Sequence, residues 1–170
     1  MRRALVPLTL MTLLMVGVQL SIFSTLRFSG VVIMIVWLWP LVVGLAGLTS
    51  LSIWTAVVAG VFFDTHSTTP FGLTAAVGVL LAYVASRLGK EGVGDLDSAA
   101  WWVTPAIAAL GGFLAPLIYV IGGFVALSFS LWRSNVVDMM FVNALAFGVL
   151  SRPLARLARS TSGLGARARR

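Results

Sequence analysis

Long apolar runs separated by short polar breaks make up nearly all of this chain. A bilayer core about 30 Å thick takes about 20 apolar residues in a helix, and most of the runs approach that length. We therefore predict an all-α polytopic membrane bundle with six transmembrane helices. The runs fall at 4–23, 31–48, 51–63, 70–88, 99–129 and 136–150.

The first run follows Arg2 and Arg3, an arrangement that secretory signal peptides share. The run is longer than a typical signal-peptide core, and no cleavage motif of small residues follows in 21–30. We interpret 4–23 as the first transmembrane helix, with Gln19 near its far end.

The second and third runs are separated only by the uncharged break 47–50. We expect a tight turn there, and one long bent segment is the alternative. Pro40 lies in the middle of the second run and predicts a kink. The third helix has about 15 residues and a length of about 22 Å, shorter than the hydrocarbon core. Either the bilayer is thinner there or neighbouring helices bury the polar ends, and partial burial of Asp64 is therefore expected.

The stretch 60–72 reads Gly-Val-Phe-Phe-Asp-Thr-His-Ser-Thr-Thr-Pro-Phe-Gly. Asp64 and His66 end the apolar run, and we predict a tight helical hairpin with a polar tip. Thr69 suits the N-cap of the next helix and Pro70 its first position. Asp64 is expected to accept hydrogen bonds from hydroxyls or amides of residues 67–69. Gly72 is expected at a close approach between helices.

The second half of the chain begins with the long hydrophilic loop 89–98. The run 99–129 exceeds one straight span and contains prolines and paired glycines. It predicts one tilted, kinked helix, with two half-helices as the alternative. A loop is expected at 131–135. Asn135 and Asp138 then have the spacing of an N-cap and a first-turn acid, and the sixth helix runs to 150 or to 157.

The charge distribution supports a membrane protein with a defined orientation. Charged residues are 10% of the chain and hydrophobic residues 59%, whereas a soluble protein has roughly 25% charged residues. Of the 12 Lys and Arg residues, only Arg27 and Arg133 fall on one predicted side. The other ten share the side of both termini, so both termini are predicted to be cytoplasmic. We divide the chain into a transmembrane domain, 1–157, and a basic, disordered cytoplasmic tail, 158–170, that lies on anionic lipid.

Few residue types are present that could carry chemistry. The chain has no cysteine, one histidine and five acids, which excludes disulfides and thiolate sites. Asp64, His66 and Ser67 lie in one short turn, too close in sequence to assemble a catalytic triad easily. Asp64 and His66 alone supply only two metal ligands. The basic residues form no groove or stacking platform for nucleic acid. We therefore expect no enzyme activity, no cofactor, no metal and no nucleic-acid partner.

The polar turn and its flanks resemble the hallmark of the MreD family. Gly60 stands four residues before Asp64, which ends a helix; a short polar turn follows, and Pro70 and Gly72 open a helix with small residues. Phe71 stands where leucine is usual in that family. The chain length, the six spans, the short third span and the basic tail also resemble the family in layout.

This resemblance implies a bacterial protein of the cytoplasmic membrane that belongs to the rod-shape machinery, the elongasome. It implies a non-enzymatic scaffold that supports lateral peptidoglycan synthesis and cell shape. The implied partners are an MreC-like coiled-coil membrane protein, MreB, RodA and a class B penicillin-binding protein. No catalytic residues are known for the family.

The layout is also similar in outline to the substrate-binding S-components of energy-coupling-factor vitamin transporters, which is the alternative function. Four polar residues, with Asp64, are predicted in the outer half and form a candidate cluster for a ligand pocket: Gln19, His66, Asp138 and Asn143. Helix caps and interhelical hydrogen bonds explain the same residues. The Ala-x-x-x-Ala pattern of the transporters' first helix is missing from 4–23. The sequence leaves open the oligomeric state and which helices contact partners.

Overall fold

Six α-helices form the protein in the computed structural model, which describes residues 2–23, 25, 27–28, 31–67, 70–90, 102–121 and 129–162. The predicted all-α class is confirmed. A π-helical turn extends the first helix, and two short strands pair antiparallel, Arg27 with Val32 and Phe28 with Val31. The elements are α1 (Arg2–Val18), η1 (Gln19–Phe23), β1 (Arg27–Phe28), β2 (Val31–Val32), α2 (Ile35–Leu45), α3 (Thr49–His66), α4 (Leu73–Lys90), α5 (Val103–Ile121) and α6 (Phe129–Ser162).

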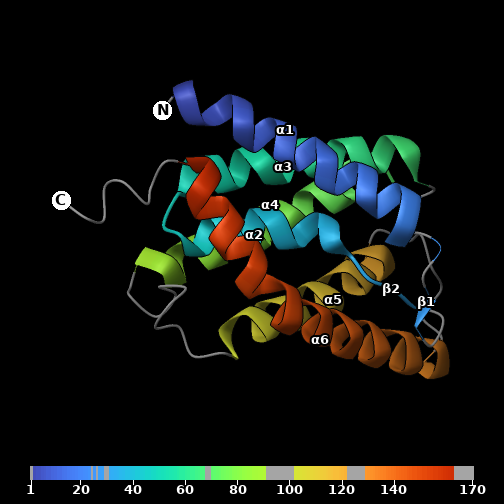
Figure 1. Cartoon of the computed structure of the whole chain (residues 1–170). Helices are drawn as coiled ribbons and strands as arrows, with labels where there is room; N and C mark the ends of the chain where they lie inside the picture. Colours follow the sequence, from blue (N-terminus) through green and yellow to red (C-terminus); the bar gives the residue numbers. More distant parts are fainter. Residues whose placement is uncertain are drawn as a thin grey trace.

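Helix α2 forms the centre of the bundle. All of its 11 residues are buried, as expected for a helix that is apolar on every side. It packs against α1, α3, α4 and α6 (Figure 1). Trp37 and Trp39 are 3% and 0% exposed, so they pack between helices and do not form an interfacial belt.

The predicted second helix, 31–48, is wrong in length. Helix α2 spans about 16 Å at 1.5 Å per residue, because the chain before it is extended through β2 to Met34. An extended buried segment needs partners for its backbone groups. Here side chains from η1 and α6 supply them, as described below. The predicted tight turn after the helix is confirmed: Gly47 has a φ of +77°, and its amide donates to the Gly44 carbonyl at 2.8 Å.

Within the described residues, three helical segments are long and apolar enough to cross a membrane: Leu5–Phe23, Leu73–Lys90 and Val136–Leu154. Three such segments in one chain indicate a multi-pass membrane protein. Helices α2 and α5 contribute shorter apolar segments, Ile35–Leu45 and Val103–Ile118.

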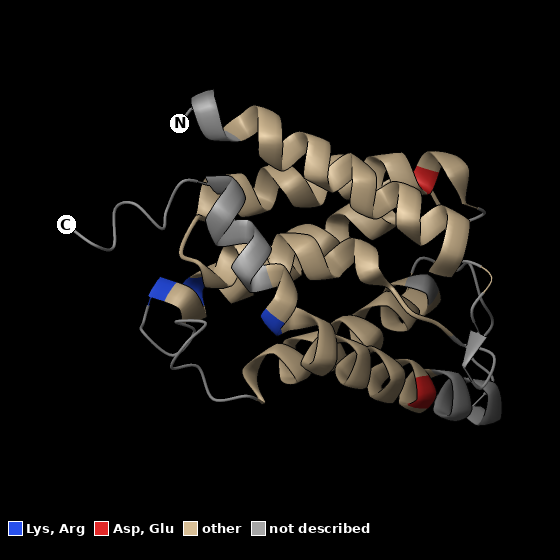
Figure 2. Cartoon of the chain, in the orientation of Figure 1, with Lys and Arg blue, Asp and Glu red and all other residues tan. Residues whose placement is uncertain are grey.

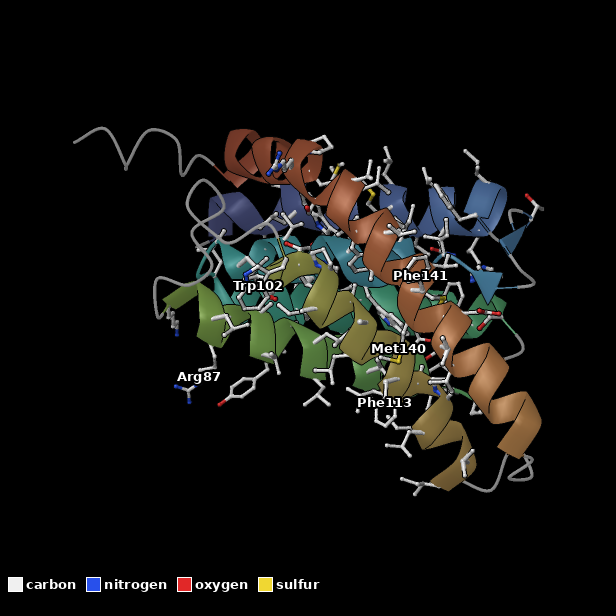
Figure 3. The ribbon with its side chains drawn as sticks, turned by 90° about the horizontal axis from the view of Figure 1, so that it is seen from below. Arg87, Trp102, Phe113, Met140 and Phe141 are labelled. Atoms are coloured by element: carbon white, nitrogen blue, oxygen red, sulfur yellow. The ribbon has the colours of Figure 1, made fainter. Side chains whose placement is uncertain are left out.

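The last third of the chain differs from the sequence-based expectation. Helix α6 begins at Phe129, so the predicted loop 131–135 is wrong and Asn135 is not an N-cap. Asp138 lies in the third turn of α6 and is not a first-turn acid. The long contact between α5 and α6 explains this result, because tertiary packing overrides local end signals. Figure 3 shows Met140 in this contact, where the Met140 Cα would lie 2.8 Å from a Cβ added at Gly112.

The predicted boundaries at the ends of these helices also shift. Helix α5 is described from Val103 to Ile121, and residues 99–101 and 122–128 of the predicted run lie outside the described part of the chain. Helix α6 passes through Pro153 and reaches Ser162, so residues 158–162 of the predicted tail are helical. Residues 163–170 and most of the loop 89–98 also lie outside the described part of the chain.

Among the charged residues that the structure describes, basic and acidic side chains lie toward opposite ends of the bundle (Figure 2). Figure 2 shows the described Lys and Arg residues toward the end where α1 begins and α6 finishes, and the described Asp residues toward the other end. Arg87 and Lys90 lie in the last turn of α4, and Asp64 lies in the last turn of α3. The Arg87 side chain extends away from the bundle (Figure 3); its Nε donates to the Tyr83 hydroxyl at 3.0 Å, and its guanidinium lies 5.3 Å from the Tyr83 ring centroid. We name these the basic end and the acidic end.

Candidate functional site

Asp64 joins helix α3 to helix α4 at the acidic end. Its side chain is 4% exposed. Oδ2 accepts hydrogen bonds from the amides of Gly72 at 2.9 Å and Thr74 at 3.2 Å, and Oδ1 lies 3.3 Å from the Thr74 amide. Amides at a helix start lack partners within the helix, and the positive end of the helix dipole favours a carboxylate. Asp64 therefore caps α4 from the last turn of α3.

The expected burial of Asp64 is confirmed, but the details of the turn differ from the prediction. Helix α3 has 18 residues and ends at His66, so Asp64 lies inside it. Helix α4 begins at Leu73, and Pro70 is therefore not its first residue. The Pro70 carbonyl instead accepts the Leu73 amide at 3.1 Å in a turn. Thr68 and Thr69, two of the expected donors to Asp64, lie outside the described residues.

The two glycines of the hairpin have different roles. Gly72 has a φ of +88°, and a Cβ there would meet no atom within 4 Å, so the predicted close approach at Gly72 is wrong. Glycine is favoured at position 72 because the backbone there has a positive φ, which glycine adopts without strain. The close approach occurs at Gly60, where a Cβ would overlap the backbone of Ala75 in α4.

Gln19 and Asn143 hold the extended segment before α2. Gln19, in η1, donates from Nε2 to the Ile33 carbonyl at 3.0 Å and accepts the Val36 amide at 3.3 Å. Asn143, in α6, accepts the Met34 amide at 2.9 Å and donates to the Met139 carbonyl at 2.8 Å. Both side chains are 0% exposed. We call Gln19, Asn143 and residues 33–36 the latch.

The other two members of the predicted polar cluster lie apart from the latch. His66 is exposed; its Nδ1 lies 2.9 Å from both the Phe62 carbonyl and the Thr65 hydroxyl. Asp138 is half-buried on α6 and does not line the cavity described next. Of the four residues in the predicted cluster, Gln19 and His66 line this cavity, and Asp138 and Asn143 are not among its described lining residues.

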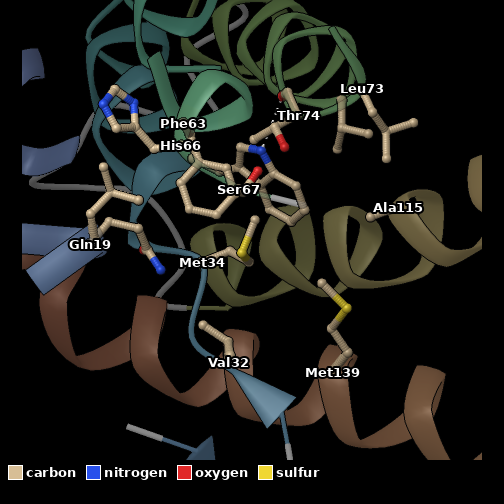
Figure 4. Close-up of a pocket in the computed structure, with 13 residues that line it drawn as sticks. Gln19, Val32, Met34, Phe63, His66, Ser67, Leu73, Thr74, Ala115 and Met139 are labelled. Atoms are coloured by element: carbon tan, nitrogen blue, oxygen red, sulfur yellow. Dashed lines mark hydrogen bonds between the residues drawn. The ribbon is translucent and has the colours of Figure 1, made fainter. Parts of the chain in front are cut away.

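A cavity of about 370 Å³ lies between these features. Figure 4 shows Gln19 from η1, Phe63 and His66 from α3, Thr74 from α4, and Met139 from α6 around it. Most of its wall is apolar. The residues that line it are Gln19, Leu20, Val32, Met34, Trp37, Phe63, His66, Ser67, Leu73, Thr74, Val77, Ala115 and Met139.

The cavity has little capacity for acid–base or metal chemistry. Among the described residues that line it, His66 is the one titratable side chain. Within the described residues, no group of three or more His, Cys, Asp or Glu side chains could hold a metal ion. Sequence reasoning found Gln19 and His66 but missed Thr74 and Met139. A threonine or methionine inside an apolar helix carries no signal that separates a cavity wall from ordinary packing.

No protein-family model, no curated protein and no solved structure matches this chain. A function must therefore be argued from the residues and their geometry.

Proposed function

We propose that this chain is a non-enzymatic membrane scaffold of the bacterial rod-shape machinery. It supports lateral peptidoglycan synthesis and cell shape by binding an MreC-like coiled-coil protein and wall-synthesis partners. The observation that carries the proposal is the α3–α4 hairpin. Gly60, Asp64 and Gly72, which carry the resemblance to the MreD family, each fix the geometry of this hairpin.

The hydrogen bonds that the buried polar side chains form with backbone groups also favour a scaffold. The carboxylate of Asp64 and the amides of Gln19 and Asn143 bind backbone groups of neighbouring segments. Such bonds hold elements in place and leave these side chains engaged. A rigid bundle is what a scaffold needs, because partners then meet a preorganised surface.

The proposed protein lies in the bacterial cytoplasmic membrane with six spans and both termini in the cytoplasm. The separation of the described charges supports this orientation, because the described Lys and Arg residues share the end where α1 begins and α6 finishes (Figure 2). The basic tail then lies against anionic lipid on the cytoplasmic side. The latch and the hairpin tip lie toward the outer face.

Two outer stripes of large apolar side chains are available to lipid or to partner helices. Their members recur every four residues, so each stripe lies along one helix face. They are Val6, Leu10 and Leu14 on α1, and Val137, Phe141, Leu145 and Val149 on α6.

Co-purification of the tagged chain from its native membrane tests the proposal. The expected partners are an MreC-like coiled-coil protein together with MreB, RodA or a class B penicillin-binding protein. A tagged Gly60→Leu variant is the matched control, because the added side chain would force α3 away from α4. Recovery of none of these proteins with the parent chain would contradict the scaffold.

The cavity favours one second candidate, a substrate-binding S-component of an energy-coupling-factor vitamin transporter. Small-molecule sites occupy about 300–1,000 Å³ and are mostly apolar with a few polar groups, and the cavity meets both conditions. The same co-purification separates the two candidates. A transmembrane coupling component with its ATPases, recovered with the tagged chain, would support the transporter.

A further inference from the structure

The cavity lies at the same end of all three helical segments that are able to cross a membrane. Gln19 and Leu20 are near the end of Leu5–Phe23, Thr74 is the second residue of Leu73–Lys90, and Met139 is near the start of Val136–Leu154. At 1.5 Å per residue, these positions are about 2–6 Å from the ends of their segments. The cavity therefore lies near the depth where hydrocarbon meets the polar interface of the membrane.

The wall of the cavity favours an uncharged occupant. None of the described residues that line it is Asp, Glu, Lys or Arg. An isolated charge placed against Trp37, Phe63 and Val77 would lose its hydration without gaining a partner. A phosphate, a carboxylate or an ammonium group is therefore disfavoured inside.

The hydroxyl of Thr74 is available to a ligand. The Thr74 amide is bound to Asp64, and its carbonyl accepts the indole N–H of Trp37 at 3.3 Å. No hydrogen bond to another described residue engages its hydroxyl, although the residue is 2% exposed and lines the cavity (Figure 4). A buried hydroxyl gains a partner when a ligand brings one.

We infer that this cavity binds a neutral amphiphile from the membrane, an aliphatic molecule that ends in a hydroxyl group. The hydroxyl bonds to Thr74 Oγ1 near the interface, and the apolar body lies against the side chains of Met34, Phe63 and Met139. Methionine side chains adapt their shape to irregular ligands, and a volume of about 370 Å³ suits a small molecule. This inference goes beyond the scaffold function and does not depend on it.

The test uses a dodecan-1-ol that carries a photoreactive diazirine, added to the full chain in nanodiscs. After irradiation, labelled peptides are mapped by mass spectrometry. We expect saturable labelling of the peptides that contain Met34, Phe63 and Met139. Excess dodecan-1-ol should compete, and equal concentrations of dodecanoate or dodecyltrimethylammonium, which have the same chain with a charged head, should not.

Two alanines of α5 provide matched variants. Ala115 lines the cavity and is 5% exposed, whereas Ala106 lies on an exposed face of the same helix. Ala115→Trp places an indole in the cavity and should lower saturable labelling at least about fivefold. Ala106→Trp adds the same side chain outside the cavity and should leave labelling unchanged.

Thr74→Val keeps the shape of the side chain and removes its hydroxyl, so the test does not rest on a bulky substitution alone. Loss of one hydrogen bond should raise the dodecan-1-ol concentration for half-maximal competition about three- to tenfold. The inference is wrong if labelling is not saturable or falls mainly on exposed faces of α1 and α6. It is equally wrong if dodecanoate competes as well as the alcohol. Partner co-purification is a separate readout, so failure here leaves the proposed function untouched.

Discussion

Buried side-chain oxygens and nitrogens in this protein mostly serve backbone groups. Thr12 and Ser86 donate to carbonyls four residues earlier in their own helices, at 2.7 and 2.6 Å. Ser52 donates across helices to the Pro40 carbonyl at 2.7 Å. Asp64 also binds backbone groups of another helix, because its carboxylate accepts hydrogen bonds from the amides of Gly72 and Thr74 at the start of α4. In an apolar environment, each such hydrogen bond avoids the free-energy cost of burying an unpaired polar group.

Two substitutions of Asp64 therefore distinguish the contribution of its negative charge to stability from the contribution of its hydrogen bonds. Asp64→Leu leaves the amides of Gly72 and Thr74 without their buried acceptor and should cost on the order of 1–3 kcal/mol of unfolding free energy. Asp64→Asn keeps one acceptor oxygen and should cost less. Thermal unfolding of the purified protein in detergent measures both. Equal stability of the Leu variant and the parent would show that the cap contributes nothing.

The two hairpin glycines should respond differently to alanine. Gly60→Ala forces a Cβ into the backbone of Ala75 and should cost about 1–3 kcal/mol, because helix backbones must separate. Gly72→Ala strains only the local backbone and should cost about 1–2 kcal/mol, with Gly72→Asn milder because asparagine tolerates positive φ. Gly17→Ala is the control, since no atom lies within 4 Å of its Cβ position. A destabilisation by Gly17→Ala as large as that by Gly60→Ala would contradict this account.

At the scale of elements, the bundle is organised around a short buried helix and the extended segment that leads into it. Helix α2 is only 11 residues long. The extended backbone before it can be buried in the bundle because the side chains of Gln19 and Asn143 form hydrogen bonds with its polar groups. The latch joins residues that are 109 positions apart, Met34 and Asn143. It thereby ties η1 and α6 to the central helix.

Removing the hydrogen bonds of Gln19 and Asn143 should destabilise the extended segment before α2. Asn143→Leu leaves the Met34 amide unpaired, and Gln19→Leu does the same to the Val36 amide; each should cost on the order of 1–3 kcal/mol. The double variant should lose less than the sum, because both side chains hold one segment. Asp138→Asn on α6, which is half-buried and outside the latch, is the control. Strict additivity in a thermal-unfolding cycle would show that the two bonds act independently.

At the scale of the whole molecule, separated charges define an axis. The basic end and the acidic end are joined by apolar helices, and positive residues of membrane proteins concentrate in the cytoplasm. The cavity, the latch and the hairpin tip all lie toward the acidic end. This end is therefore expected to meet partners outside the cytoplasm.

Reporter fusions test this orientation. A reporter fused after Arg170 should report a cytoplasmic location, because an even number of spans places both termini on the same side. A reporter inserted at 65–67 should report a location outside the cytoplasm. Insertion at 86–90, in the last turn of α4, is the control and should read cytoplasmic. An external C-terminus would indicate an odd number of spans or the inverse orientation.

Much of the architecture could be predicted from the apolar runs, and the failures have physical causes. The runs gave the six helices and the hairpin, and the uncharged break marked the turn at Gly47. They could not give the short length of α2, because the bonds that keep residues 33–34 extended come from distant parts of the chain. Nor could they show that the carboxylate of Asp64 accepts hydrogen bonds from the amides of Gly72 and Thr74 at the start of α4. The cavity was invisible because its wall is as apolar as the core around it.

The most direct measurement of the central claim is cell-shape complementation by Asp64→Leu, with membrane levels and partner recovery measured in parallel. The account predicts rounded cells and reduced recovery of the MreC-like partner, although the variant inserts at parental levels, because α3 and α4 lose their fixed angle. Asp64→Asn should keep the cells rod-shaped. Rod shape and full partner recovery with the Leu variant would contradict the claim and reduce the hairpin to a connector.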